Sequence, residues 1–297
     1  MRRPPWLPDR WRLGLGLLLG PYLVGSVLLV AIPGLLSLGL AFTTYDGLTP
    51  PVFVGFTNFR LLASDPLVPV ALGNTLLFIL LAVPLRIGGA LVLALLLQRR
   101  RSGAGTARVA VYLPAVIPDV AYALVWLWVF NPLFGPVNLA LGALGLPMPG
   151  WLADPSTAKI PFVVMAAFTL GEGFVVLLAA RKGVPAAIYE AGALEGGGSW
   201  ALFRGLTLPL LMPWLVLLTF RDIILGFQWT FGPATVMTGG GPYYSTFFVP
   251  QLIYEEAFDR FRYGTGSALM LLVAVMSGAL MVGLWLILRA RRYGDVA

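Results

Sequence analysis

Five ionisable side chains lie inside long apolar stretches of the sequence: Arg86, Asp119, Glu172, Arg221 and Asp222. A charge at membrane depth is costly, so it usually marks a transport path or an ion pair between helices. Gln228, Trp229 and Phe231 follow the last two charges and add an amide and two aromatic rings. We expect these groups to line a solute pathway, with structural ion pairs as the alternative use of the charges. The expected pathway residues are Asp119, Glu172, Arg221, Asp222, Gln228, Trp229 and Phe231.

Catalytic chemistry has few candidate groups, because the 297 residues include no cysteine and no histidine. Disulfides, Cys/His zinc sites, cysteine nucleophiles and triads with an imidazole base are therefore excluded. A phosphate-binding Walker A loop needs Gly-Lys-Ser/Thr, but Lys159 follows an alanine and Lys182 an arginine. We expect a chain that is not an enzyme, with no catalytic residue, no metal site and no cofactor of its own.

Composition shows which elements must position the charges. Hydrophobic residues make up 59% of the chain and charged residues 11%, against about 25% charged in soluble domains. Apolar stretches near the roughly 20 residues that cross a bilayer predict an all-α membrane protein with about six transmembrane helices. These helices are expected at about 16–42, 70–97, 109–131, 158–180, 209–235 and 265–290. The expected domains are a cytoplasmic segment 1–15, a transmembrane domain 16–290 and a cytoplasmic tail 291–297.

Basic residues indicate the orientation, because lysine and arginine stay preferentially on the cytoplasmic side. Fourteen of them flank the expected spans on the side of the two termini, against four on the other side: Arg60, Lys159, Arg260 and Arg262. Both termini are therefore expected in the cytoplasm, and loops 43–69, 132–157 and 236–264 outside. The same topology explains the net charge of +7 without nucleic-acid binding.

The loop between the fourth and fifth spans, residues 184–213, has strong local signals. Pro185 suits the first turn of a helix, and the glycines at 196–198 end it after about ten residues. Ile188, Ala191 and Leu194 give this helix an apolar stripe. A second short helix, about 200–208, is expected to lead into the fifth span, so the loop forms a small stiff element.

A motif in this loop resembles a known family. Glu190-Ala191-Gly192, Gly196, Leu206 and Leu208-Pro209 match the spacing of the EAA loop of binding-protein-dependent ABC importer permeases, EAA-x3-G-x9-I-x-LP. Gly192 replaces the second alanine, and Leu206 replaces the isoleucine. The resemblance implies the type I ABC importer permease fold.

Further segments resemble one branch of that family, the maltose, trehalose and glycerol-phosphate permeases. They are residues 54–59, 73–75, 135–138, 151–154, 237–242, 245–246, 253–254, 257–258 and 263–264. The resemblance implies a heterodimer with a second homologous permease, two ATP-binding subunits that bind ATP and Mg, and an extracytoplasmic solute-binding protein. It also implies sugar import across a bacterial inner membrane.

The resemblance assigns roles to two sets of residues. ATPase coupling is expected from Tyr189, Glu190, Ala191, Gly192, Leu194, Glu195, Gly196, Leu206, Leu208 and Pro209. Docking of the binding protein is expected at Gly239, Gly240, Gly241 and Pro242. Two alternatives remain open: an ion-coupled secondary transporter or channel, and ABC import of a glycerophosphodiester or another polyol.

Overall fold

The computed structural model describes residues 9–99 and 101–294, and the side chains of 14–99 and 101–288. The expected terminal segments 1–15 and 291–297 lie partly outside the described residues. Among the described residues, five helical segments are long and apolar enough to cross a membrane, or six if one bent pair forms a single span. The five are Gly14–Leu40, Leu67–Leu96, Lys159–Lys182, Ser199–Gly226 and Tyr263–Leu288. The predicted all-α architecture with about six spans is confirmed.

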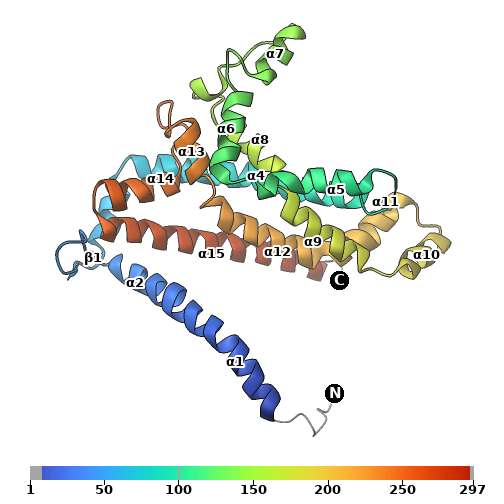
Figure 1. Ribbon diagram of the computed structural model, residues 1–297, viewed down its shortest axis with the longest axis horizontal. Coiled ribbons are helices and arrows are strands. Elements are labelled where there is room, and N and C mark those ends of the chain that lie inside the picture. The colour runs from blue at the N-terminus through green and yellow to red at the C-terminus, as the bar shows by residue number, and fades with distance from the viewer. Residues whose placement is uncertain (1–8, 100, 295–297) are drawn as a thin grey trace. The chain divides into compact units, whose positions relative to one another are not determined.

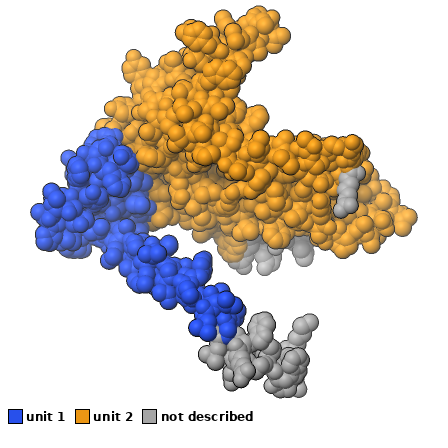
Figure 2. All heavy atoms as spheres, in the orientation of Figure 1, with its two compact units in different colours: residues 1–64, 253–272 blue, residues 65–252, 273–297 orange. Residues whose placement is uncertain are grey.

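The chain divides into two compact units, residues 1–64 with 253–272, and residues 65–252 with 273–297 (Figure 2). Unit 1 holds α1 (Asp9–Ser26), η1 (Val27–Ala31), α2 (Ile32–Leu40), β1 (Thr43–Thr44), β2 (Val52–Phe53), α3 (Thr57–Ser64), η5 (Glu255–Asp259) and the start of α15 (Tyr263–Gly294). β1 and β2 pair antiparallel. The buried Asn58 amide donates to the carbonyls of Ala41 (2.9 Å) and Thr43 (2.8 Å), which fixes α3 against the end of α2.

Unit 2 contains the other spans (Figure 1). Its first elements are α4 (Leu67–Leu96), α5 (Ala104–Tyr112), η2 (Leu113–Val116), α6 (Asp119–Val129), α7 (Pro136–Ala143), η3 (Trp151–Ala153), α8 (Lys159–Phe168) and α9 (Gly171–Lys182). The later ones are α10 (Ala186–Leu194), α11 (Ser199–Leu202), η4 (Phe203–Thr207), α12 (Leu208–Gly226), α13 (Phe231–Met237), most of α14 (Val249–Tyr254) and the rest of α15. Helix α4 packs against α8, α9 and α12.

The apolar core of unit 2 lies where α4, α6, α8, α12 and α13 meet. Phe248 is fully buried, and its ring makes edge contacts with Phe78 and Phe162 at centroid distances of 5.9 and 5.6 Å. Close packing of these rings holds the helices together through van der Waals contacts, which drive helix association in a membrane. α10 and α11 lie at one end of unit 2, and α13 lies toward the other (Figure 1).

Three predicted spans differ from the structure. The expected helix 109–131 is broken, because η2 ends at Val116 and α6 starts at Asp119, after a bend of 104°. Pro118 causes the break: a proline disfavours helical geometry in the residue before it, and Ile117 is extended with ψ 131°.

The other two differences are interruptions of the helix at residues that sequence periodicity does not mark. Helix α8 ends at Phe168 and α9 starts at Gly171, so the expected span 158–180 consists of two helices. The expected span 209–235 ends at Gly226, and a turn precedes α13. Each break leaves backbone groups without helical partners inside the bundle.

Candidate functional site

Residues 184–209 form a compact helical loop. We call it the coupling loop after the role that the sequence resemblance predicts for it. α10 starts after the extended Pro185 (ψ 137°), as predicted. It ends where Gly196 adopts a left-handed conformation, φ +85°, and Gly197 donates to the carbonyl of Gly192 at 3.1 Å. This bond is part of the usual glycine C-cap, in which backbone groups beyond the helix satisfy its last carbonyls.

Gly192 lies where α10 packs against the leucines of the segment that follows it. A Cβ atom there would lie 2.7 Å from Leu202 Cδ2 and 3.0 Å from Leu206 Cδ1. A side chain at this position would require the Leu202 and Leu206 side chains to move. The close packing gives a physical reason for glycine at the position where the EAA pattern has alanine.

Tyr189 joins the coupling loop to two other elements. Its hydroxyl lies 3.1 Å from Oγ1 of the buried Thr207, at the end of η4. The Arg181 guanidinium, in the last turn of α9, lies 3.9 Å from the centre of the Tyr189 ring, within the range of a cation–π contact. Tyr189 is half-buried against the protein's own helices, and Arg181 thereby has a structural partner that the sequence did not indicate.

The outer face of the coupling loop is exposed and partly apolar. Leu194 is 89% exposed, Trp200 71% and Ile188 39%. Glu190 and Glu195 are exposed on the same loop. Exposed apolar groups with adjacent carboxylates form a surface that suits a protein partner.

A second site is a polar cavity of about 360 Å³ among α4, α6, α9 and α12. Its lining is Arg86, Pro114, Ala115, Ile117, Asp119, Tyr122, Thr169, Glu172, Arg221, Leu225, Gln228 and Trp229. The helix interruptions after η2 and after α8 both lie at the wall of this cavity, because Ile117 and Thr169 are among its lining residues. We call it the polar cavity.

Ion pairs connect the charges around the polar cavity. Arg86 Nη1 lies 3.5 Å from Asp222 Oδ2, and Arg221 Nη1 lies 3.3 Å from Asp222 Oδ1. Arg221 also pairs with Glu172. Arg86 Nη2 donates to the carbonyl of Thr169, 3.2 Å away, which the break between α8 and α9 leaves free. These contacts link α4, α9 and α12.

The structure brings together most of the expected pathway residues. Asp119, Glu172, Arg221, Gln228 and Trp229 line the cavity. The Asp222 side chain is only 4% exposed and lies behind the wall, paired with both arginines. Phe231, in α13, is not part of the lining.

Sequence analysis did not indicate the partner of Arg86, and it did not single out Tyr122 or Thr169 as members of the wall. Arg86 was visible as a charge in an apolar stretch, but nothing local indicated its partner on α12. Tyr122 donates from its hydroxyl to the carbonyl of Met165 at 3.1 Å. Thr169 has no sequence signal beyond the glycine at 171, which starts α9 against the backbone of Tyr112.

The glycines expected to dock a binding protein shape a tight loop, in which Gly239 is exposed and Gly240 is buried. Gly239 and Gly240 have φ of +60° and +90°, and a Cβ atom on Gly240 would lie 2.8 Å from Phe247. The exposed tip of this loop is aromatic: Tyr243 is 90% exposed and Tyr244 51%.

Asn74 of α4 holds the same loop in place. Its amide donates to the carbonyls of Tyr244 (2.8 Å) and Phe247 (2.9 Å). The neighbouring Thr75 hydroxyl accepts from the backbone N–H of Val249 at 3.0 Å. The motif at residues 73–75 therefore orders the tip.

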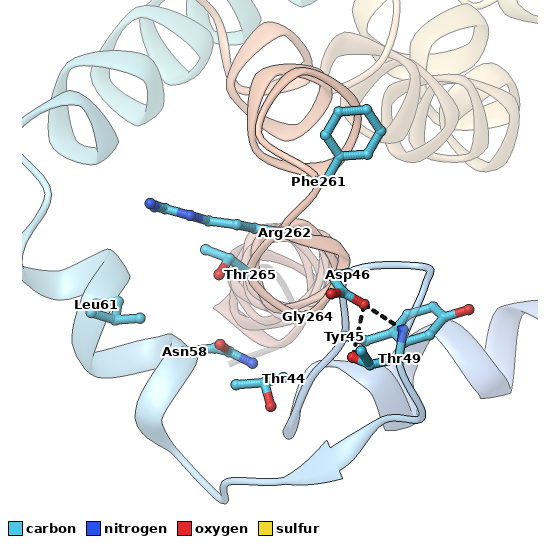
Figure 3. A pocket seen from close by; sticks show the side chains of 10 residues that line it. All are labelled: Thr44, Tyr45, Asp46, Thr49, Asn58, Leu61, Phe261, Arg262, Gly264 and Thr265. Carbon is cyan, nitrogen blue, oxygen red and sulfur yellow. Dashed lines mark hydrogen bonds between the residues drawn. The ribbon is translucent and has the colours of Figure 1, made fainter.

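Unit 1 contains a further cavity of about 420 Å³ (Figure 3). It is lined by Thr44, Tyr45, Asp46, Thr49, Asn58, Leu61, Phe261, Arg262, Gly264 and Thr265. Asp46 Oδ1 accepts from the N–H groups of Thr49 (2.8 Å) and Leu48 (3.0 Å), and from the Thr49 hydroxyl (2.9 Å). These bonds lower the pKa of Asp46, and they show that its carboxylate caps a turn.

Comparison with solved structures defines the class of fold. The chain superposes on a bacterial ABC transporter involved in the import of the acidic polysaccharide alginate with a TM-score of 0.80, at 22% identity over 97% of this chain and 98% of that one. The same transporter type in complex with an alginate pentasaccharide-bound periplasmic protein gives a TM-score of 0.78 at 21% identity, over 94% and 95% of the two chains.

Curated relatives establish the family. No family model matches the chain. The lactose transport system permease protein LacF of Rhizobium radiobacter is 34% identical over 82% of this chain and 85% of its own. The probable ABC transporter permease protein PH1215 of Pyrococcus horikoshii is 30% identical over 93% and 94%. The chain therefore belongs to the ABC transporter permeases, a family of multi-pass membrane proteins.

Proposed function

We propose that this chain forms half of the translocation pathway of an ATP-driven sugar importer in a bacterial cytoplasmic membrane. A second homologous permease supplies the other half, and an extracytoplasmic binding protein delivers the sugar. Relatives named for lactose, starch degradation products and sulfoquinovosyl glycerol support a carbohydrate substrate. ATP and Mg are bound by two partner subunits.

The observation that carries this proposal is the geometry of the coupling loop. Its glycine-capped helix is anchored on its inner side through Gly192 and Tyr189 and exposes apolar groups on its outer side. A rigid element transmits the displacement of a partner, whereas a flexible one absorbs it. The outer face, with Glu190 and Leu194, fits a groove of an ATPase subunit.

The orientation of the chain in the membrane follows from docking of the coupling loop to an ATPase. The coupling loop faces the cytoplasm, as do both termini, in agreement with the excess of basic residues on that side. The loop with Tyr243 at its tip then faces outward and is available to the binding protein. The polar cavity lies between these two ends of unit 2 and is the segment of the pathway that this subunit provides.

Reconstitution of the full complex in proteoliposomes tests the proposal. Uptake of a labelled sugar should require the binding protein and internal ATP, and should not respond to proton or sodium gradients. Uptake that follows an ion gradient without ATP or binding protein would establish a secondary transporter instead. A binding-protein screen that includes glycerophosphodiesters and polyols decides the substrate class.

A further inference from the structure

The arginines of the polar cavity are already neutralised by the protein. Arg86 is bound by the Asp222 carboxylate and the Thr169 carbonyl. Arg221 is held between Asp222 and Glu172. An anionic ligand would have to compete with these carboxylates for the arginines, and its charge would come close to theirs.

The charge balance of the cavity is negative. Among the described residues that line it or pair with its lining, two are cationic, Arg86 and Arg221, and three are acidic, Asp119, Glu172 and Asp222. Asp119 occupies the first turn of α6, so its carboxylate takes the positive end of that helix, where an anion would otherwise bind. The described wall therefore has no excess of positive charge that would attract an additional anion.

The groups that remain free suit hydroxyls. Within the described part of the chain, the side chains of Asp119 and Gln228 are exposed and make no hydrogen bond or ion pair, whereas the Gln228 backbone is hydrogen-bonded. A carboxylate accepts hydrogen bonds from two or more hydroxyls, and an amide both donates and accepts. Trp229 adds an aromatic ring to the same wall.

We propose that the polar cavity selects an uncharged sugar and discriminates against uronates, sulfonated sugars and sugar phosphates. This inference rests on the proposed function and narrows its substrate class. It separates this chain from structural neighbours whose substrate is the acidic polysaccharide alginate, and it argues against the glycerophosphodiester alternative.

Saturation-transfer NMR on the purified complex without binding protein tests the cavity directly. Glucose and glucuronate serve as a matched pair of probes that differ by one carboxylate. The wild-type complex should bind glucose at least about tenfold more tightly than glucuronate. Equal affinities, preference for glucuronate, or absence of glucose binding would overturn the inference.

Charge-removing variants test whether the carboxylates of the polar cavity cause the preference for glucose over glucuronate. Glu172→Gln and Asp119→Asn each remove one negative charge with almost no change of volume, and together they should reduce the preference for glucose about tenfold. Asp259→Asn, an equal charge change at an exposed position outside the cavity, should leave the preference unchanged. An unchanged preference in the double variant would place the selectivity elsewhere.

A transport assay separates failure of this inference from failure of the proposed function. ATP-dependent, binding-protein-dependent uptake of an acidic sugar would leave the importer assignment intact and refute the charge selectivity. Uptake driven by an ion gradient alone would refute the importer assignment, whatever the charge of the sugar.

Discussion

Tyr189 provides the sharpest test of how the coupling loop is connected to the membrane helices. Tyr189→Phe removes the hydroxyl that lies 3.1 Å from Thr207 Oγ1 and keeps the ring beneath Arg181. Arg181→Gln removes the cation and keeps the hydrogen bond. The two substitutions therefore separate the contact of α10 with η4 from its contact with α9.

The free energy that each substitution removes from the attachment of the coupling loop follows from the contact that it breaks. A hydrogen bond of this kind contributes about 1 kcal/mol net, and a cation–π contact at a partly exposed site about 0.5–1 kcal/mol. A loss of about 1 kcal/mol raises the population of a detached coupling loop about fivefold. Since the exposed face of α10 is unchanged, ATPase docking should persist while transmission of its motion weakens.

The assay is the number of ATP molecules hydrolysed per sugar imported in proteoliposomes. Tyr189→Phe and Arg181→Gln should each raise this ratio, with hydrolysis retained. Thr207→Val should have the same effect as Tyr189→Phe, and their combination should be no worse than either alone, because both remove one hydrogen bond. Lys182→Gln, an exposed neighbour of Arg181, is the control and should behave as wild type. Additive effects of the Tyr189 and Thr207 substitutions, or an unchanged ratio, would refute the assigned contact.

Three further outcomes are expected. Gly196→Ala forces a side chain into the left-handed conformation at φ +85°, which costs about 1–2 kcal/mol, and should raise the ATP-to-sugar ratio without loss of membrane insertion. Asn74→Ala leaves the carbonyls of Tyr244 and Phe247 unpaired, which costs about 2 kcal/mol, and should lower the Tm of the detergent-solubilised protein; an unchanged Tm would contradict this role. The N–H groups of Thr49 and Leu48 lower the pKa of Asp46 below 3.8, so its stabilisation of the turn is complete above that value and is lost as the pH falls through the lowered pKa; an NMR titration that gives 3.8 or higher would contradict the capped turn.

The coupling loop was predictable from sequence because its signals are local. Pro185 and Gly196 fix the two ends of α10 through backbone geometry alone, and the structure has a helix between them. The role of Tyr189 was not predictable in detail, since its partners come from helices that precede and follow the loop. The replacement of the second alanine of the EAA pattern by Gly192 is likewise explained only by the folded structure, in which Leu202 and Leu206 pack close to this position.

The sequence predicted several residues that line the polar cavity, but it did not predict how their charges pair. The cost of buried charge identified Asp119, Glu172 and Arg221 from sequence, and all three line the cavity. Their pairing depends on the packing of α4, α9 and α12, which no periodicity encodes. Hydrophobicity alone placed a continuous span across Pro118, whereas the structure bends there by 104°.

Three asparagines lie in motifs that the sequence shows, but the sequence does not show what their side chains bind. Asn58, Asn74 and Asn138 each lie in a segment that resembles the sugar permeases. Each side-chain amide donates to two backbone carbonyls, and for Asn74 both acceptors lie more than 160 residues away. Sequence shows such a residue as a polar position, but only the folded chain shows which loop it secures.

Helix α9 links the polar cavity to the coupling loop. It carries Glu172 in its first turn, at the cavity wall, and Arg181 in its last turn, against Tyr189. At a rise of about 1.5 Å per residue, about 14 Å separates the two side chains. If a partner ATPase moves the coupling loop as proposed, α9 is the element that connects this movement to Glu172, the carboxylate that pairs with Arg221 at the polar cavity.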